Sequence, residues 1–369
     1  MNKNKYINFI DLKSRYLEEK NQLLKIIDRV LKSGNLILSE ENDNLEKKIC
    51  KYLDSNYCLT LNSGTDALML ALWAVGIKKG DEVITSTISF IATAASIAHV
   101  GAIPVFVDVK DDLNIDPDLI EKKITKKTKA IIPVHWTGKM CDMKKIKAIA
   151  KKYRLAVIED SAQAIGSKYY GKRPGYYSDI ATFSTHPLKI LNAVGDGGFL
   201  TTNNKVYYEA IKKYRNHGMI SRDNFEFYGV NSRLDSIHAA VISYRLDRVN
   251  EIIRKRQNNI NLYRKYIKSR YFRIIDCEKY EFNSFTMFVA LAEKRNELKE
   301  YLAKNNIESL IYYGTPLHLQ TASKYLGYGL GSFPQAEMFC KKVISLPFHQ
   351  SITKKQIIYI SDKINEFYS

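Results

Sequence analysis

The sequence lacks the features that mark secreted, membrane-spanning and metal-binding proteins. Its five cysteines are scattered, form no Cys-x-x-Cys pair and add to an odd number, so we expect free thiols in a reducing cytoplasm. Met1 to Leu12 is too polar for a signal peptide, and no apolar run approaches the roughly eighteen residues of a membrane span. The seven histidines show no metal-ligand spacing. These absences predict a cytoplasmic protein with no membrane span and no metal site.

A dinucleotide-binding fingerprint and an internal repeat are also missing. The segment Gly327 to Gly331 has alternating glycines, but no strand precedes it and no third glycine stands at the fingerprint spacing. We therefore expect neither a dinucleotide site nor a repeat architecture.

Acidic residues are few compared with basic ones. The 39 Asp and Glu residues against 57 Lys and Arg residues give a formal net charge of +18. Such an excess is compatible with a nucleic acid, an acidic membrane surface or an anionic small substrate. The basic residues occupy ordinary helix-surface positions and form no compact arginine–aromatic array, so a solvated surface is the favoured interpretation.

Helices and short apolar strands alternate along most of the chain. A chain of 369 residues with 45% hydrophobic residues can bury a large core and divide into about two domains. The alternation predicts an α/β fold whose mostly parallel central sheet is flanked by helices. The predicted helices are about Leu12–Lys32, Asp66–Val75, Ile91–Val100 and Met143–Tyr153, and the predicted strands are Val83–Ser86, Val105–Val109, Ala130–Val134, Leu155–Ile158 and Asp179–Phe183.

A long helix from about Leu234 to Ile267 is predicted to lead into a smaller α+β domain. We place a large domain at residues 1–245 and a small C-terminal domain at 246–369. The small domain is expected to contain a strand at Phe285–Leu291 and helices near Glu297–Lys304 and Thr353–Phe367.

Polar residues gather where two predicted strands end. Glu159–Gln163 follows one strand, Ser184–Lys189 follows the next, and the glycine-rich segment Gly195–Gly198 comes after them. The carboxyl edge of an open α/β sheet is where ligands bind, and a glycine run lets the backbone approach a ligand closely. The pattern predicts a carboxylate, a hydroxyl, an amine and a flexible loop at one sheet edge.

Each of these residues also has an ordinary structural interpretation. A lysine amine can form a Schiff base with an aldehyde, but most lysines lie at the surface, and Lys189 taken alone would be expected there. Asp160 could be a buried partner for a cationic ring or a helix N-cap. Ser63, Gly64 and Thr65 precede a predicted helix, where they could bind a phosphate or only cap the helix.

Five segments in a fixed order resemble the DegT family of sugar aminotransferases, which are fold-type I pyridoxal phosphate enzymes. The resemblance spans nearly the whole chain. The segments are Asn62–Leu68, Asp160–Gln163, Ser184–Lys189, Gly195–Gly198 and Gly229–Asp235.

The resemblance implies a role for each cofactor-site residue. Lys189 would hold the cofactor as a Schiff base and then move protons as the catalytic acid and base. Asp160 would keep the pyridine nitrogen protonated, and Gln163 would reach the phenolic oxygen. The cofactor phosphate would be bound by residues Ser63, Gly64, Thr65 and Ser184.

Four further residues are placed by the resemblance, each with a plainer alternative. Phe90 would stack on the pyridine ring, although a core phenylalanine is the alternative. Asn231 would reach the cofactor phosphate of a neighbouring subunit in a homodimer, or merely stabilise its own loop. His186 and His318 would line the substrate pocket, although single histidines are more often structural.

The predicted function is transfer of an amino group from an amino acid, taken to be L-glutamate, to a keto group of a nucleotide-linked sugar. Pyridoxamine phosphate would be the aminated form of the cofactor. The Gly-Asp-Gly-Gly form of the glycine segment resembles relatives that act at C3 of the sugar. Departures from the family pattern at Thr185, Ile190 and His238 bear on substrate choice.

Two other functions stay open at this point. The first is an aminotransferase that acts on a smaller phosphorylated ketone or a cyclitol. The second belongs to another class, a nucleic-acid-binding or regulatory protein built on a degenerate aminotransferase fold. The full set of Lys189, Asp160, Gln163 and Ser184 favours the enzyme and predicts no nucleic-acid partner.

Overall fold

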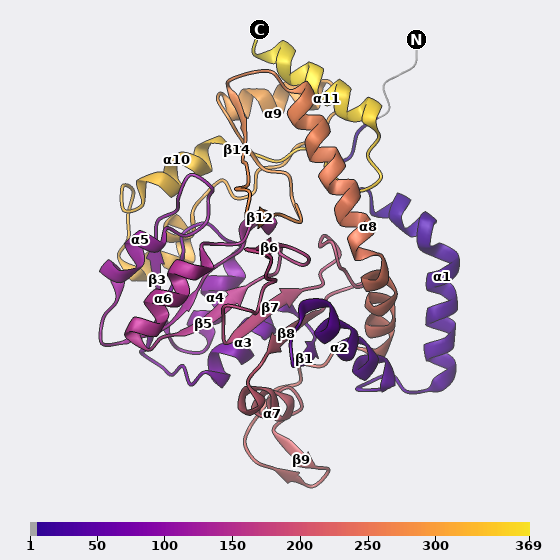
Figure 1. Cartoon of the computed structure of the whole chain (residues 1–369), viewed down its shortest axis with the longest axis vertical. Coiled ribbons are helices and arrows are strands. Elements are labelled where there is room, and N and C mark those ends of the chain that lie inside the picture. Colours follow the sequence, from indigo (N-terminus) through magenta and orange to yellow (C-terminus); the bar gives the residue numbers. More distant parts are fainter. Residues whose placement is uncertain (1–5) are drawn as a thin grey trace.

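A seven-stranded sheet forms the centre of the protein, in the strand order β1-β8-β7-β5-β4-β2-β3. The structure is a computed structural model and describes residues 6–369 (Figure 1). Strand β8 pairs antiparallel with β1 and β7, and the remaining pairs are parallel, as an α/β fold requires. The strands are β1 (Tyr57–Leu61), β2 (Glu82–Ser86), β3 (Ile103–Val107), β4 (Thr128–Ile132), β5 (Ala156–Asp160), β7 (Ile180–Ser184) and β8 (Gly198–Thr202).

Helices cover both faces of this sheet. Successive residues of a strand point to opposite faces, so Val157 of β5 packs into the cluster that contains Ile146, whereas Ile158 packs with Leu68. The predicted layered arrangement is therefore confirmed. The helices of this part are α2 (Glu40–Leu53), α3 (Gly64–Ala74), α4 (Ile91–His99), α5 (Pro117–Ile120), α6 (Met143–Tyr153) and α7 (Lys205–Tyr214), with short 3₁₀ turns at η1 (Glu121–Lys123) and η2 (Trp136–Gly138).

The long helix α8 (Ser236–Tyr266) leads from the sheet to the C-terminal part of the chain. There Tyr263 and Phe288 pack into one core with Ile357. The predicted boundary at 245/246 falls inside α8, and the division into two domains stays a prediction. The other elements are β11 (Phe272–Ile274), β13 (Ala290–Ala292), β14 (Val343–Ile344), α9 (Arg295–Lys304), η3 (Leu317–Leu319), η4 (Thr321–Leu326), α10 (Pro334–Lys342) and α11 (Lys354–Phe367).

The predicted strand at Phe285–Leu291 is wrong over most of its length. Only β13 pairs in the sheet, and Phe285 has a positive φ of 52°, which an extended strand does not allow. The apolar side chains of this segment are buried in a loop, with Phe288 in the C-terminal core. A continuous run of buried apolar residues is also typical of a buried strand, which is why the sequence pattern predicted one here.

Segments near the two ends of the chain meet. Ile7 forms a parallel bridge with Ile307, and the helix α1 (Leu12–Ser33) packs on α8 through Leu23 and Val30. Two short hairpins complete the fold, β6 (Lys168–Tyr169) with β12 (Glu281–Phe282) and β9 (Met219–Ser221) with β10 (Asn224–Phe225).

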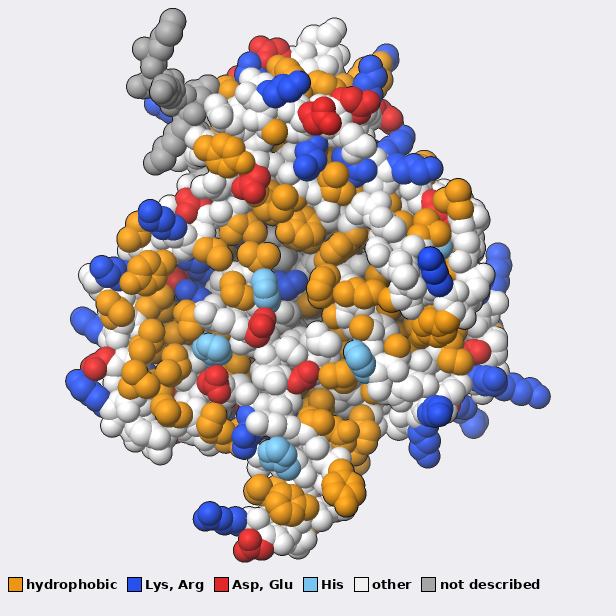
Figure 2. All heavy atoms as spheres, turned by 180° about the vertical axis from the view of Figure 1, so that it is seen from behind, with side chains coloured by type: hydrophobic (Ala, Val, Ile, Leu, Met, Phe, Trp, Pro, Cys, Tyr) orange, Lys and Arg blue, Asp and Glu red, His pale blue; other side chains and the backbone are white. Residues whose placement is uncertain are grey.

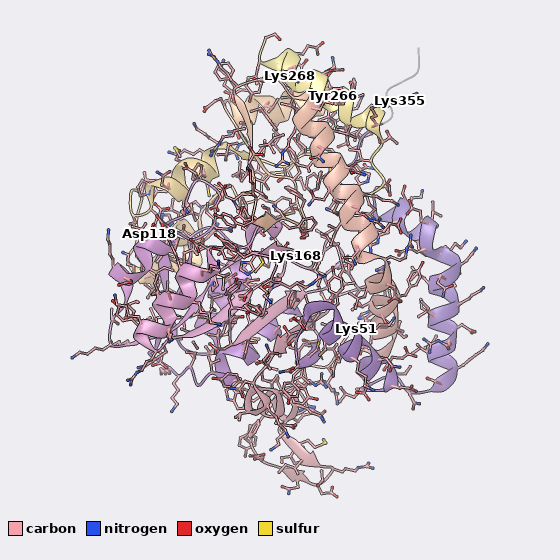
Figure 3. All side chains as sticks on the ribbon, viewed as in Figure 1. Lys51, Asp118, Lys168, Tyr266, Lys268 and Lys355 are labelled. Atoms are coloured by element: carbon pink, nitrogen blue, oxygen red, sulfur yellow. The ribbon has the colours of Figure 1, made fainter. Side chains whose placement is uncertain are left out.

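All five cysteines are free thiols, as predicted. Over residues 6–369, no helix combines the length and the apolar character that crossing a bilayer requires. The first five residues of the polar Met1–Leu12 segment lie outside the described part. Figure 3 shows Lys51, Lys168 and Lys355 on separate elements, in keeping with dispersed positive charge.

Candidate active site

A cavity of about 500 Å³ lies where β5 and β7 end. It brings together nine residues that the sequence predicted for the site: Ser63, Gly64, Thr65, Phe90, Asp160, Gln163, Ser184, His186 and Lys189. Figure 2 shows the face opposite to that of Figure 1, where hydrophobic side chains surround a few histidine, basic and acidic ones. The sheet edge thus collects the predicted groups in one enclosed space.

Asp160 is buried at the end of β5, and its carboxylate oxygens accept hydrogen bonds from two donors. The Thr93 hydroxyl donates to Asp160 Oδ2 at 2.7 Å, and the Ala162 amide donates to Oδ1 at 3.2 Å. Ser89 lies 2.7 Å from Thr93 Oγ1, and because Thr93 donates to the carboxylate, Ser89 supplies the hydrogen of this second bond. The two hydroxyls and the amide therefore fix the orientation of the Asp160 carboxylate.

A second buried carboxylate supports this strand end. Glu159 Oε2 lies 2.7 Å from His135 Nε2, and both side chains are fully buried. The Cys141 amide donates to His135 Nδ1 at 3.2 Å, so Nε2 carries the hydrogen and donates to Glu159. The His135 amide also donates to the Asp160 carbonyl oxygen at 3.1 Å. This pair fixes the backbone from which Asp160 projects.

Lys189 reaches the cavity from a tight loop after β7. Its amide donates to the His186 carbonyl at 2.9 Å, and the Ala193 amide donates to the Thr185 carbonyl at 2.7 Å, which closes the loop. Burial lowers the pKa of the Lys189 amine to about 8, and the attraction of Asp160 opposes the shift. The amine is therefore closer to its neutral, nucleophilic form at physiological pH than an exposed lysine.

The N-terminus of α3 lines the cavity beside the end of β7. Ser63 caps this helix, because its hydroxyl accepts a hydrogen bond from the Asp66 amide at 3.0 Å, so the capping interpretation is correct for its side chain. A Cβ on Gly64 would lie 2.8 Å from the Ser184 Cβ, and one on Gly198 would lie 2.5 Å from the Gly64 nitrogen. Glycine is required at both positions so that strand ends and helix amides can crowd together.

Gln163 follows Asp160 in a series of turns and does not begin a helix. Its Oε1 accepts a hydrogen bond from the Thr137 amide at 2.7 Å, and its side chain also bonds to Tyr313. Phe90 is 57% exposed, so it is not a core phenylalanine. Its ring lies 6.3 Å from that of Tyr313 at the cavity wall. One flat wall of the cavity is therefore aromatic.

Comparison with known proteins agrees with this geometry. The DegT/DnrJ/EryC1/StrS aminotransferase family matches residues 17–365. A pleiotropic regulatory protein of Geobacillus stearothermophilus is 38% identical over 98% of both chains. The dTDP-3-amino-3,6-dideoxy-alpha-D-galactopyranose transaminase of Aneurinibacillus thermoaerophilus is also 38% identical, over 98% of this chain and 99% of its own. DesV of S. venezuelae has a TM-score of 0.97 and 33% identity, with 99% of each chain covered.

The chain belongs to the DegT/DnrJ/EryC1/StrS aminotransferase family. Its fold is that of the fold-type I aminotransferases. The family depends on pyridoxal phosphate, and structures similar to this chain include pyridoxal phosphate and pyridoxamine phosphate forms.

The cavity of this family member fits the cofactor in the chemistry of its donors. The buried carboxylate of Asp160 suits a cationic ring, and the Lys189 amine with its lowered pKa suits an aldehyde. The N-terminus of α3, beside a serine hydroxyl, suits a phosphate. Added Cβ atoms at Gly64 and Gly198 would collide with Ser184 and with the backbone at Ser63 and Gly64, so the close packing at the α3 N-terminus depends on glycine.

Two predicted residues lie outside this cavity. His318 is buried beside Glu337, with 3.1 Å between Nε2 and Oε1, so its side chain has a structural partner. Asn231 is exposed, and its Oδ1 accepts a hydrogen bond from Arg233 Nε at 2.9 Å. The loop-stabilising interpretation fits this contact, and the role of Asn231 toward a second subunit stays a prediction.

Sequence reasoning missed several residues that shape the cavity. Thr93 stood in the same segment as Phe90 and could have been found from its spacing along α4. Arg15 and Arg256 line the cavity from α1 and α8, and no local motif marks either of them. Only the packing of distant helices brings these arginines to the site.

Proposed function

We propose that this aminotransferase binds pyridoxal phosphate in the cavity through Lys189, Asp160 and the N-terminus of α3. The observation that carries the proposal is the pairing of the Lys189 amine, whose pKa is lowered to about 8, with the doubly hydrogen-bonded Asp160 carboxylate. Ser63, Gly64, Thr65 and Ser184 would hold the phosphate, and Phe90 would cover the ring.

Each residue then has a distinct task. When bound, the cofactor supplies an electron sink that stabilises negative charge at the carbon from which a proton is removed. Asp160 keeps the ring nitrogen protonated, which this sink requires. Lys189 Nζ removes a proton from the donor carbon in the first half-reaction. It delivers a proton to the acceptor carbon in the second. The buried Thr93 and Ser89 hydroxyls form a hydrogen-bonded chain that orients the Asp160 carboxylate.

For the acceptor we propose a keto group of a nucleotide-linked sugar, with L-glutamate as the donor. The relative from Aneurinibacillus is named for a dTDP-linked 3-amino sugar, which supports a nucleotide sugar and amination at C3. Asp196 of the Gly-Asp-Gly-Gly segment lines the cavity, where it can contact the substrate.

We also propose a homodimer, in which Asn231 of one subunit reaches the phosphate site of the other. Asn231 is exposed, and an antiparallel bridge between the Asn216 and Asn231 backbones holds its loop. The hairpin of β9 and β10 that precedes it exposes Ile220 and Phe225, as an unpartnered apolar surface would.

Colour provides the first test. Purified protein with pyridoxal phosphate should be yellow, borohydride should fix the chromophore to Lys189, and L-glutamate should bleach it. Protein that stays colourless after addition of the cofactor would defeat the proposal and favour the regulatory alternative.

Product analysis provides the second test. Mass spectrometry of reactions between L-glutamate and a panel of keto-sugar nucleotides should reveal one aminated sugar nucleotide, with the amine at C3. Exclusive amination of a phosphorylated ketone or a cyclitol would overturn the choice of acceptor while leaving the aminotransferase activity intact.

A further inference from the structure

The wall of the cavity formed by α1, α8 and the loop at 348–350 carries an excess of buried positive charge. Arg15 and Arg256 line this wall, and each residue is more than nine-tenths buried. Nε of both side chains and Nδ1 of His349 are buried without a hydrogen-bond partner among the described residues. Two guanidinium groups and one imidazole thus line the same cavity, and the Nε–H of each guanidinium has no hydrogen-bond acceptor within bonding distance among the described residues.

Arg256 is held by neutral partners only. Its Nη1 donates to the carbonyl oxygens of Phe285 at 3.0 Å and Thr286 at 2.8 Å. Within residues 6–369, no carboxylate lies at ion-pair distance from this guanidinium. Burial and the nearby charge of Arg15 lower the pKa of Arg256 to about 9. The carbonyl contacts orient the guanidinium but do not neutralise it.

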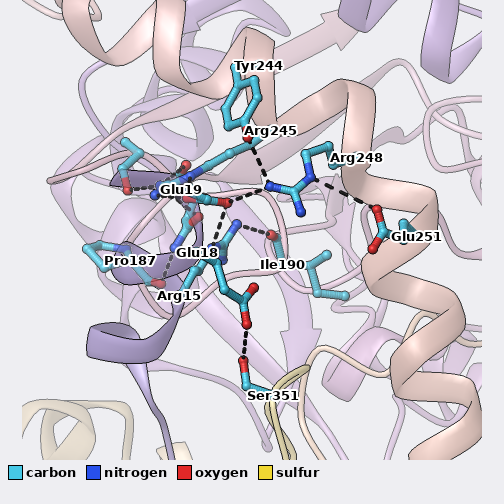
Figure 4. Close-up of polar contacts among 12 residues, drawn as sticks. Arg15, Glu18, Glu19, Pro187, Ile190, Tyr244, Arg245, Arg248, Glu251 and Ser351 are labelled. Atoms are coloured by element: carbon cyan, nitrogen blue, oxygen red, sulfur yellow. Dashed lines mark hydrogen bonds and ion pairs between the residues drawn. The ribbon is translucent and has the colours of Figure 1, made fainter. Parts of the chain in front are cut away.

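Arg15 belongs to a network in which one carboxylate serves three arginines (Figure 4). Glu19 accepts hydrogen bonds from Arg245 Nε at 3.0 Å and Nη2 at 2.7 Å. Its other oxygen lies 3.6 Å from Arg15 Nε and 3.8 Å from Arg248 Nη1, beyond hydrogen-bonding distance. The remaining contact of Arg15 is a long hydrogen bond of 3.5 Å to the Ile190 carbonyl. Glu19 is therefore committed mainly to Arg245.

The acidic groups near this wall do not remove the excess. Asp11 caps α1 through the Ser14 amide and hydroxyl, and its charge acts on His349. Glu18 is exposed and accepts a hydrogen bond from Ser351. Asp160 is engaged by Thr93 and Ala162 at the Lys189 end of the cavity. An anion entering the cavity would meet cationic donors at the wall of α1 and α8.

We propose that Arg15 and Arg256, with His349, form an oxyanion subsite that binds a carboxylate of the amino-acid donor. This inference rests on the proposed function, because the donor amine must reach Lys189 and the cofactor in the same cavity. A substrate diphosphate has the same anionic oxygen chemistry. The enclosed apolar surroundings of Phe288 and Phe348 favour the smaller carboxylate, since a diphosphate needs more polar partners.

Separate measurement of the two half-reactions tests the subsite. Wild-type holoenzyme, R256K and R15Q are mixed with L-glutamate, and the aminated forms are then mixed with the keto-sugar nucleotide, while the cofactor absorbance is followed. We expect the glutamate saturation constant to rise at least about tenfold in both variants, as for loss of one charge-assisted hydrogen bond, and the sugar constant to stay within about twofold. R254Q, exposed on the same helix, is the matched control and should change neither.

Three results would overturn the subsite. One is an unchanged glutamate constant in both R15Q and R256K. Another is a change confined to the sugar nucleotide, which would assign the arginines to the diphosphate. The third is an equal change in R254Q.

Unaltered protein gives an independent measurement if a variant does not fold. Calorimetry should detect glutarate binding to the wild-type holoenzyme, and glutarate should compete with glutamate, whereas inorganic pyrophosphate should not. Pyrophosphate competition without glutarate binding would overturn the carboxylate assignment. Glutarate binding without bleaching by any amino acid would instead show that the proposed transamination fails while the subsite exists.

Discussion

The two ends of the cavity are built in different ways. The end with Lys189 and Asp160 comes from the last residues of adjacent strands and from the start of α3. The end with Arg15 and Arg256 comes from α1 and α8, which are far apart in the sequence and meet by packing. Short sequence motifs mark the residues of the first end. The residues of the second end are brought together only when the chain folds.

The two ends also differ in charge. At the sheet edge the Lys189 amine has the Asp160 carboxylate as an acidic neighbour, so a base is accompanied by an acid. At the helical end Glu19 serves three arginines, and Arg256 has no acidic partner among the described residues. The cavity therefore has both acidic and basic groups at one end and an excess of positive charge at the other. Such a cavity is suited to a substrate whose anionic group lies apart from its reacting group.

Replacement of Lys189 should have the largest effect. K189A removes the amine that we propose holds the cofactor and moves the proton, so we expect turnover to fall by at least about 10³-fold. Steady-state assays with the preferred donor and acceptor measure this loss. K205A, at the exposed start of α7, is the control, and near-normal rates in K189A would refute the assignment.

The same variant should not lose stability. The folded pKa of Lys189 is about 8, below the ordinary value of 10.5, so charging this amine opposes folding at all pH values below about 8. That penalty is relieved as the pH rises from about 8 to 10.5. Apoprotein K189A should therefore unfold at least as high in denaturant as wild-type apoprotein at pH 7.

Replacement of Asp160 should have the next largest effect. D160A removes a buried carboxylate that would face the cationic ring, and we expect a loss of about 10²-fold in the proton-transfer step together with weaker cofactor retention. Rapid-kinetic absorbance and equilibrium dialysis measure the two effects. D111A, at an exposed aspartate, is the control, and unchanged kinetics in D160A would contradict the role toward the ring nitrogen.

Much of the fold could be predicted because local signals agreed with it. The bounds of α6 were predicted correctly, since Asp142 caps its start and a left-handed Arg154 ends it. The antiparallel strand β8 was not predicted, because its five residues begin at Gly198, which looks like a loop residue. The segment Phe285–Leu291 was taken for a strand because buried loop residues share the composition of strands.

As with the fold, only some of the residues of the site could be predicted from the sequence. Asp160 and Lys189 could be predicted because strand ends and a family motif place them at one edge. Arg15 and Arg256 could not, since a single arginine on a helix gives no sign that the side chain will be buried. His318 was grouped with the pocket by its position in the sequence, but the fold places it beside Glu337. Whether such a side chain reaches the cavity depends on contacts between elements that are far apart in the sequence.

At the arginine end of the cavity, removal of the Glu19 carboxylate should lower the stability of the fold more than the rate of the reaction. E19Q leaves Arg15, Arg245 and Arg248 without their shared anion, and we expect a loss of about 3 kcal/mol in the free energy of unfolding. Chemical denaturation of the apoprotein measures it. E18Q, at the exposed neighbouring residue, should be nearly neutral. Equal stability of E19Q and wild type would mean that the network adds nothing to the fold.

The smallest expected effect is a shift in the pH dependence of cofactor capture. Only the neutral amine attacks an aldehyde, so the rate at which apoprotein captures pyridoxal phosphate should rise with pH to a midpoint near 8 and then level off. An ordinary lysine, with a pKa near 10.5, would show a rate that keeps rising about tenfold per pH unit to pH 10. Because Asp160 raises the pKa of Lys189, D160N should move the midpoint to lower pH. Stopped-flow absorbance from pH 6 to 10 measures both midpoints, and a shift to higher pH in D160N would show that Asp160 does not act on this amine.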